Sequence, residues 1–345
     1  MKKVKFHRDF KLNGVSFSSE DEVINYSAKL SSELYQFLKN WFSDDSFILV
    51  NTSGSTGKPK KIKLQKKQMI NSAFATGNYF DLKENTSALL CLSVRYIAGK
   101  MMLVRALTLG WHLDVVETNS FPLKEIQKEY DFSAMVPLQL ENSLDKIHFI
   151  KKLIVGGGVV SSNLQEKIQS ANCNVYATYG MTETITHIAI KKLNNINLKP
   201  SFYNVLPNVE IYKDGRSCLV IKALNVSDEI VFTNDIVDLI SDTQFNWLGR
   251  YDNVINSGGV KLHPEIIEEK LTVIISNRFF VTGIPDEKLG KKLVLVVEGQ
   301  RKEICFSNSS LSKFETPKEV YFINEFIETE TKKIQRSKTL DLIKY

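Results

Sequence analysis

Strand-like and helix-like stretches alternate through the first part of the chain, and this alternation most constrains its fold. Apolar residues at roughly helical spacing over residues 23–42 predict a helix, and the apolar run Phe47–Val50 predicts a buried strand. The alternation continues with helices expected over 65–79, 99–109 and 163–170 and strands expected over 87–93, 113–116, 133–136, 152–155 and 174–177. Strands that alternate with helices indicate an α/β fold with a largely parallel sheet.

The pattern changes after about residue 208, where short strands are separated by turn signals such as Lys213-Asp214-Gly215. Beyond Gly249-Arg250-Tyr251-Asp252, a Gly-Gly turn, a helix over 264–271 and strands over 279–283 and 293–297 predict a small α+β unit. We therefore expect a large α/β domain over residues 1–249, a hinge at 250–252 and a small α+β domain over 253–345.

Composition excludes several classes of protein. The length of 345 residues and the hydrophobic fraction of 43% suit one large and one small domain. The net charge of +6 is spread along the chain without a basic stripe and interleaved aromatic residues, so nucleic-acid binding is not expected. The most apolar region, residues 88–116, is interrupted by Arg95, Lys100 and Arg105, which argues against a membrane span.

The cysteines and the N-terminal residues indicate a cytoplasmic protein. No cysteine lies close to another in sequence or at a metal-site spacing, so we interpret all of them as free thiols of a reducing compartment. They are Cys91, Cys173, Cys218 and Cys305. Residues 1–14 have no apolar core of a signal peptide. Whether the protein forms a homo-oligomer stays open.

The segment TSGSTGKPK, residues 52–60, follows the predicted strand Phe47–Val50. Glycines let backbone N–H groups approach a phosphate chain closely, and serine, threonine and lysine side chains add donors and charge. A Walker-type loop has four residues between its first glycine and its Gly-Lys pair, whereas Gly54 and Gly57 are separated by two. A phosphate-binding loop of another kind is therefore favoured over a polar surface turn.

Four segments, in this order, resemble motifs of the adenylate-forming superfamily of acyl- and aryl-CoA synthetases, luciferases and peptide-synthetase adenylation domains. Residues 52–60 match its T-S-G-[ST]-T-G-x-P-K loop at every fixed position, and residues 179–184, YGMTET, resemble its YGxTE motif. Residues 249–259 resemble its GRxDxxxxxGG hinge motif, and residues 329–336, TETKKIQR, resemble its terminal PxTxSGKIxR. The resemblance extends from Phe47 to the C-terminus.

Within the superfamily, the chain most resembles compact o-succinylbenzoate–CoA ligases of menaquinone biosynthesis. The phosphate loop lies early in the chain, so we expect much of the first N-terminal subdomain to be missing. The segment YGMTETITHIAIKKLN, residues 179–194, is also similar to that subfamily, particularly Thr186-His187-Ile188-Ala189. The alternatives are another aryl- or acyl-CoA ligase and a non-catalytic nucleotide-binding member of the superfamily.

The resemblance implies a reaction in two halves that uses ATP, Mg²⁺ and coenzyme A. A carboxylate attacks the α-phosphorus of ATP to give an acyl-adenylate and pyrophosphate, and the thiol of coenzyme A then displaces AMP. By resemblance, Thr182 contacts the α-phosphate, Glu183 holds Mg²⁺ and Lys333 bridges the α-phosphate and the attacking carboxylate. Lys332 occupies the position of the family's glycine before that lysine.

The remaining nucleotide contacts are also implied by position in the motifs. The expected ATP-binding residues are Thr52, Ser53, Gly54, Ser55, Thr56, Gly57 and Lys58 at the phosphates, Gly156, Gly157, Gly158 and Tyr179 at the adenine, Gly180 beside it, and Asp235 and Arg250 at the ribose. Asn234 replaces the glycine of the family's T-G-D motif, and we expect it to keep that turn because asparagine tolerates left-handed backbone.

Rotation of the small domain about Asp252 is expected to separate the two half-reactions, with Ser257, Gly258 and Gly259 lining the coenzyme A tunnel. In the acid pocket, an unreacted second carboxylate needs a cation or strong donors. Arg95 and Lys100 are the candidate cations, Tyr96 is a candidate aromatic wall, and Thr186 and His187 are candidate donors. The alternative is that Arg95 and Lys100 only solvate the ends of their elements.

Overall fold

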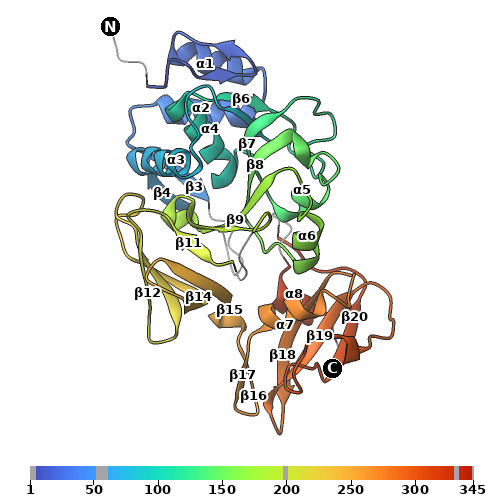
Figure 1. The fold of residues 1–345 in the computed structure, drawn as a ribbon. Helices are drawn as coiled ribbons and strands as arrows, with labels where there is room; N and C mark the ends of the chain where they lie inside the picture. Colours follow the sequence, from blue (N-terminus) through green and yellow to red (C-terminus); the bar gives the residue numbers. More distant parts are fainter. Residues whose placement is uncertain (1–4, 52–60, 197–200, 330–333, 344–345) are drawn as a thin grey trace.

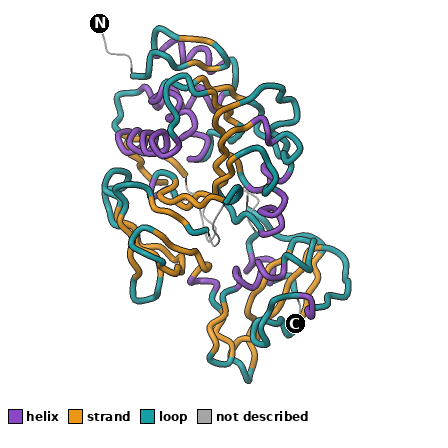
Figure 2. The backbone as a smooth tube through the Cα atoms, viewed as in Figure 1, coloured by secondary structure: helices purple, strands orange, loops and turns teal. Residues whose placement is uncertain are grey.

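The computed structural model describes residues 5–51, 61–196, 201–329 and 334–343. Figures 1 and 2 show a large N-terminal part, which contains α1 to α6 and most of the strands, above a smaller part with α7 and α8. The phosphate loop and Lys333 fall outside the described residues.

One sheet of 13 strands runs through the described residues of the large part. In spatial order its strands are β12 (Glu210–Lys213), β13 (Cys218–Lys222), β14 (Val231–Leu239), β15 (Gln244–Arg250), β11 (Tyr203–Val205), β10 (His187–Lys192), β9 (Asn174–Gly180), β8 (Ile150–Val155), β7 (Tyr130–Met135), β5 (Ser87–Leu90), β6 (His112–Val115), β1 (Lys11–Leu12) and β2 (Val15–Ser16).

The prediction of a largely parallel sheet is right for only one half of this sheet. The pairs β9–β8, β8–β7, β7–β5, β5–β6 and β6–β1 are parallel. From β9 to β12 every neighbouring pair is antiparallel. Neighbouring strands in sequence can pair antiparallel through short turns, whereas parallel strands need long crossovers. The turn signals after residue 208 predicted short strands, which the structure has as β12 to β15, but we did not predict their antiparallel pairing within the large sheet.

The helices cover both faces of the parallel half (Figure 1). Its described helices are α1 (Glu20–Ala28), α2 (Ser32–Phe42), α3 (Lys66–Phe80), α4 (Ile97–Leu109), α5 (Pro137–Glu141) and α6 (Ser162–Lys167). The buried side chains of α2, α3 and α4 form one apolar core, and Leu140 of α5 and Leu164 of α6 belong to a second core. The two cores take alternate residues of β5, Leu90 and Leu89 respectively, because strand side chains alternate between faces.

Two local predictions need correction. The helix expected over residues 23–42 is divided into α1 and α2, because Ser31 adopts extended backbone and its Oγ caps α2 by accepting a hydrogen bond from the N–H of Leu34. The strand β3 (Phe47–Asn51) pairs antiparallel with β4 (Lys61–Gln65), which we did not predict, and not with the parallel sheet. The segment 52–60 therefore connects two antiparallel strands.

The small part has a sheet of its own and two helices among its described residues. The sheet consists of β16 (Ile255–Ser257), β17 (Val260–Leu262), β18 (Phe279–Asp286), β19 (Gly290–Glu298) and β20 (Glu319–Ile323), and the helices are α7 (Pro264–Leu271) and α8 (Arg336–Leu340). The large sheet ends with β15 at Arg250, and the small sheet begins with β16 at Ile255. The change of sheet falls between Arg250 and Ile255, and the domain boundaries at 249 and 253 stay a prediction.

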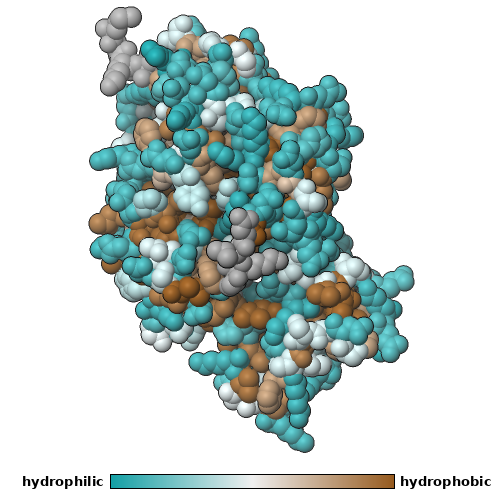
Figure 3. Space-filling model, viewed as in Figure 1, coloured by the Kyte–Doolittle hydropathy of each residue, from teal (hydrophilic) through white to brown (hydrophobic). Residues whose placement is uncertain are grey.

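The surface carries mainly hydrophilic residues on the face in Figure 3, and apolar residues gather near the junction of the two parts. Across the described ranges of the chain, no helix combines the length and apolar character that a membrane crossing requires.

Candidate active site

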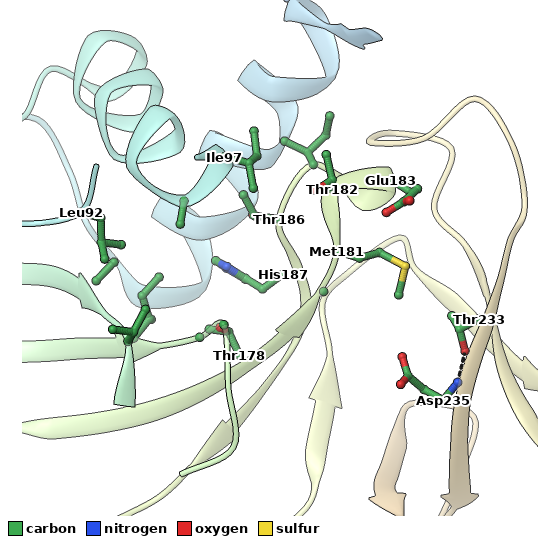
Figure 4. Close-up of a pocket in the computed structure, with 18 of the residues that line it drawn as sticks. Leu92, Ile97, Thr178, Met181, Thr182, Glu183, Thr186, His187, Thr233 and Asp235 are labelled. Carbon is green, nitrogen blue, oxygen red and sulfur yellow. Dashed lines mark hydrogen bonds between the residues drawn. The ribbon is translucent and has the colours of Figure 1, made fainter. Parts of the chain in front are cut away.

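A cavity of about 770 Å³ opens at the carboxyl ends of the parallel strands. Its lining includes Leu92 after β5, Val136 after β7, Gly156 after β8 and Met181 after β9. Ligands of open α/β sheets bind at this edge, where the loops between strands and helices converge. The opposite wall comes from the antiparallel half, with Asp235 of β14 and Arg250 of β15 (Figure 4).

The fold brings many of the predicted site residues to this one cavity. The predicted residues that line it are Gly156, Gly157, Gly180, Thr182, Glu183, Thr186, His187, Asp235 and Arg250. Other predicted residues lie elsewhere: Arg95, Tyr96, Lys100, Gly158, Tyr179, Asp252, Ser257, Gly258 and Gly259 are not part of its wall. Residues 52–58 and Lys333 are outside the described chain, so their roles stay predictions.

The two candidate cations of the acid pocket bind other groups of the protein. Arg95 is exposed, and its Nε lies 2.6 Å from a carboxylate oxygen of Glu33 on α2. Lys100 is buried, and its Nζ donates to the carbonyl oxygens of Val94 and Arg95 at 2.5 and 2.7 Å. In the structure both residues therefore contact the segment before α4 or helix α2 and do not line the cavity, and Tyr96 is the N-cap of α4.

Arg105 is a buried cation that lines the cavity together with Arg250, and we did not select it from the sequence. It lies on α4, is 2% exposed, and donates through Nε to Thr76 Oγ1 at 3.1 Å and through Nη2 to Thr186 Oγ1 at 3.3 Å. Within the described chain no carboxylate pairs with it, and burial lowers its pKa to about 9. The signal in the sequence was a single arginine in the apolar stretch Met101–Leu107.

Thr76 and His187 complete the network behind Arg105. Thr76 has one hydroxyl proton, which it donates to the carbonyl of Ser72 at 3.0 Å, so it accepts the bond from Arg105. His187 Nε2 lies 3.3 Å from the same oxygen and must therefore be the donor. Burial, followed by the charge of Arg105, lowers the pKa of His187 to about 3, so the ring is neutral with Nδ1 as an acceptor.

The YGMTE segment presents Thr182 and Glu183 to the cavity through a tight turn. Thr182–Thr184 form a 3₁₀ turn, and Thr184 Oγ1 accepts from the N–H of Met181 at 3.1 Å. Ile185 has a φ of +65°, an uncommon value for a β-branched residue, which indicates a backbone held under strain. Glu183 remains exposed and its carboxylate reaches the cavity (Figure 4).

These residues fit a magnesium ion that arrives with a nucleotide. No cluster of three or more candidate metal ligands occurs in the part of the chain that the structure describes. Magnesium bound to a nucleotide commonly takes one or two protein carboxylates and completes its shell with phosphate oxygens and water. Glu183 is the carboxylate at the cavity that fits this role.

Gly180 is required where β9 meets the strained turn. A Cβ at this position would lie 2.0 Å from the carbonyl oxygen of Thr186 and 2.5 Å from the Cα of His187. We expect Gly180→Ala to shift Thr186 and His187 and to lower the rate of acid activation about 100-fold, as ångström-scale misplacement of site groups does. The rate of ATP–pyrophosphate exchange measures this activation. Gly215→Ala is the control, because no atom lies within 4 Å of the Cβ that it adds. Equal activity of both variants would contradict the prediction.

Tyr179 is held differently from our prediction of stacking on adenine. Its ring packs edge-on against Tyr203 and Phe245, with centroids 5.9 and 5.1 Å away, and it does not line the cavity. Its hydroxyl donates to Asp235 Oδ2 at 2.7 Å. The structure therefore gives Tyr179 a role in holding Asp235, whereas Gly156 and Gly157 remain at the cavity wall.

Asn234 lies within strand β14 and its φ is not positive, so the left-handed turn that we predicted at this position is wrong. Its Oδ1 accepts from Arg216 Nη1 at 2.9 Å, and its Nδ2 donates to Asp252 Oδ2 at 3.1 Å. The predicted hinge residue Asp252 is thereby tied to the large part. Ser257, Gly258 and Gly259 belong to the β16–β17 hairpin at the lower end of the small part in Figure 1, and none of them lines the cavity.

Comparison with known proteins gives a consistent result. A model of the AMP-binding enzyme family matches residues 11–216. A 2-succinylbenzoate–CoA ligase of Geobacillus sp. (strain WCH70) is 26% identical, and the match covers 91% of this chain and 72% of the relative.

Two solved structures are similar to this one. An acyl-CoA synthetase (AMP-forming)/AMP-acid ligase II-like protein from Dyadobacter fermentans DSM 18053 is 38% identical, with a TM-score of 0.61, over 90% of this chain and 93% of that one. O-succinylbenzoate coenzyme A synthetase from Bacillus subtilis, in complex with ATP and magnesium ion, has a TM-score of 0.73 at 21% identity, over 84% of this chain and 69% of that one.

The cavity lies at the carboxyl ends of the parallel strands, and its wall carries the exposed Glu183 and the buried Arg105. The family match extends over more than half of the chain, and the first of the two solved structures matches nearly its whole length. The chain belongs to the AMP-binding enzyme family.

Proposed function

We propose that the chain is an ATP- and Mg²⁺-dependent acid–CoA ligase that acts on 2-succinylbenzoate through an acyl-adenylate. The relative named for this activity and the structure solved with ATP and magnesium support the reaction class and its co-substrates. The observation that carries the proposed acid is Arg105, a buried guanidinium at the cavity wall without a carboxylate partner in the described chain.

Arg105 has donors left for a substrate carboxylate. A guanidinium has five N–H groups, and Thr76, Thr186 and the sulfur of Met102 accept one bond each. The two remaining N–H groups suit an anionic oxygen, and a buried charge is costly unless it is paired. 2-Succinylbenzoate has two carboxylates, one of which does not react, so the unreacted one is the proposed partner of Arg105.

The cavity separates an acid end from a nucleotide end. Thr186 and His187 lie on one side, Thr233 and Asp235 lie on the other, and Met181, Thr182 and Glu183 lie between them (Figure 4). We place the unreacted carboxylate at Arg105, the adenosine near Asp235 and Arg250, and the reacting carboxylate and α-phosphate near Thr182. This arrangement holds the reacting carboxylate next to the α-phosphate. Such positioning supplies a large part of the rate enhancement in a reaction of this kind.

The protein groups act mainly by charge and position. Glu183 would hold the magnesium ion, which, when bound, neutralises phosphate charge during the displacement. Lys333 is proposed to stabilise the charge that develops as the carboxylate attacks phosphorus, and Ser53 to Lys58 to hold the β- and γ-phosphates. Transfer to coenzyme A is proposed to follow rotation about Asp252, which would bring Ser257, Gly258 and Gly259 toward the cavity.

A cytoplasmic location is part of the proposal. The four cysteines are free in the structure, and three of them are buried. Unpaired thiols suit a reducing compartment.

The proposal is tested by ATP–pyrophosphate exchange with a panel of acids: 2-succinylbenzoate, 3-benzoylpropanoate, benzoate, coumarate, fatty acids and amino acids. We expect exchange with 2-succinylbenzoate and thioester formation when coenzyme A is added. 3-Benzoylpropanoate is the matched control, because it keeps the side-chain carboxylate and lacks the one on the ring. Exchange with a different acid alone would replace the substrate, and nucleotide binding without any exchange would indicate a non-catalytic protein.

A further inference from the structure

Asp235 is held from both of its carboxylate oxygens. Tyr179 donates its hydroxyl proton to Oδ2 at 2.7 Å, and Trp247 donates its indole N–H to Oδ1 at 3.1 Å. Arg250 Nε lies 3.7 Å from Oδ1, and the N–H of Asp235 donates to Thr233 Oγ1 at 3.0 Å (Figure 4). Asp235 is 6% exposed and lines the cavity, whereas neither Tyr179 nor Trp247 does.

A β-bulge brings Trp247 to this position. In the register of β14 and β15, Asp235 pairs with Arg250, Ile236 with Gly249 and Val237 with Trp247, so Leu248 is an extra residue on β15. Directly opposed residues of an antiparallel pair share a face, and residues three apart on a regular strand do not. The extra residue therefore places Trp247 and Arg250 together on the face of Asp235.

We propose that Trp247 is a positioning residue for nucleotide recognition, which fixes the Asp235 carboxylate so that it accepts both hydroxyl groups of a ribose. The two oxygens of a carboxylate offer about four lone-pair positions. Tyr179 and Trp247 occupy one on each oxygen, which leaves one on each for a vicinal diol. A carboxylate fixed by two donors does not need to be ordered when the nucleotide binds, so less binding free energy is lost.

This inference rests on the nucleotide binding of the proposed function and adds the residue that makes it selective for ribose over deoxyribose. Trp247 is suited to this role because its N–H can only donate, so it cannot accept a hydrogen bond from a ribose hydroxyl and divert that hydroxyl from Asp235. A tyrosine, serine or asparagine at this position could also accept a bond and offer the ribose hydroxyls an alternative partner.

The test is calorimetric titration of the whole protein with ATP and with 2′-deoxyATP, which needs no acid and no turnover. Trp247→Phe removes the donor and keeps an aromatic ring. We expect this variant to bind ATP about tenfold more weakly, as loss of a hydrogen bond to a charged group implies, and to bind 2′-deoxyATP with a smaller loss. The ratio of the affinity for ATP to the affinity for 2′-deoxyATP would therefore be smaller in the variant than in the wild type.

Trp41→Phe is the matched control, because Trp41 lies on α2 and packs against Phe37 far from Asp235 in sequence and fold. Tyr179→Phe is the second variant: it removes only the hydroxyl that holds Oδ2 and should lower the same ratio even if Trp247→Phe fails to fold. If the variants lost the same affinity for ATP as for 2′-deoxyATP, or lost no affinity for either nucleotide, the proposal would be wrong. A wild-type protein that binds ATP but activates no acid would refute the proposed ligase activity and leave this test in force.

Discussion

Replacing Arg105 by methionine is expected to remove the preference for 2-succinylbenzoate while leaving the folded protein as stable as before or more stable. Arg105 is buried with no carboxylate partner in the described chain, and desolvation lowers its pKa. The charged guanidinium therefore destabilises the folded protein when no substrate is bound. Hydrophobic residues that replace buried charges are often neutral or stabilising. The same charge is the partner of the substrate in our proposal.

The expected loss is large and specific to one substrate carboxylate. Removing one partner of a buried, hydrogen-bonded charge pair weakens binding by several kcal/mol, so kcat/KM for 2-succinylbenzoate should fall about 100-fold or more. For 3-benzoylpropanoate, which lacks the ring carboxylate, the same variant should lose little and could gain activity. Pyrophosphate exchange with both acids and thermal unfolding without substrate measure the two halves of the prediction.

Arg95→Met is the control, because it removes a cation of the same type from an exposed ion pair with Glu33. Surface ion pairs contribute little, so this variant should resemble the wild type in both measurements. An equal loss for both acids in Arg105→Met, or a marked fall in its unfolding temperature, would mean that Arg105 supports the fold and does not select the substrate.

Arg105 is a site residue that could not be predicted from the sequence. The same apolar stretch is interrupted by three cations, Arg95, Lys100 and Arg105. Nothing in the composition of that stretch distinguishes one of them from the others. They differ in position: Arg95 precedes α4, whereas Lys100 lies in its first turn and reaches back to the carbonyls of Val94 and Arg95. Arg105 lies about one and a half turns later, beside Thr76 and Thr186. Thr76 belongs to another helix, so no local pattern places it next to Arg105.

Residues within contiguous motifs were easier to predict. Thr182, Glu183, Thr186 and His187 follow one strand closely, so a single turn delivers all four to the cavity. Trp247 was missed because strict strand alternation puts residues 247 and 250 on opposite faces, and only the bulge reverses this. β4 was missed although its sequence Lys-Ile-Lys-Leu-Gln alternates, because we expected no element over residues 61–64 and began the next helix at Gln65.

Replacing Lys333 by alanine is expected to cripple adenylate formation and spare thioester formation. Its proposed role is to stabilise charge that develops between the carboxylate and the α-phosphate, which exists only in the first half-reaction. Loss of such a stabilising group lowers rates about 100- to 1000-fold. Pyrophosphate exchange reports the first half-reaction, and thioester formation from supplied acyl-adenylate and coenzyme A reports the second.

Described residues on both sides of this lysine are fixed to the small part. Glu328 and Ile334 form a β-bridge, and the N–H of Gln335 donates to the carbonyl of Ile327 at 2.8 Å. Arg336 pairs with the half-buried Glu268 of α7 at 2.8 Å and donates to the carbonyl of Val281 at 3.1 Å. Lys333 is thus close in sequence to firmly held residues and would move with the small part, as separation of the half-reactions by domain rotation requires.

Lys332 and Lys338 make the experiment decisive. Lys338 is an exposed residue of α8, so Lys338→Ala should leave both half-reactions unchanged. Lys332 stands at the family's glycine position, and Lys332→Ala should therefore have a minor effect on adenylation. If Lys332→Ala instead loses exchange while Lys333→Ala keeps it, the motif is aligned one residue too far along. If Lys333→Ala loses both half-reactions equally, this lysine contributes to substrate binding or folding and has no special part in the attack on phosphorus.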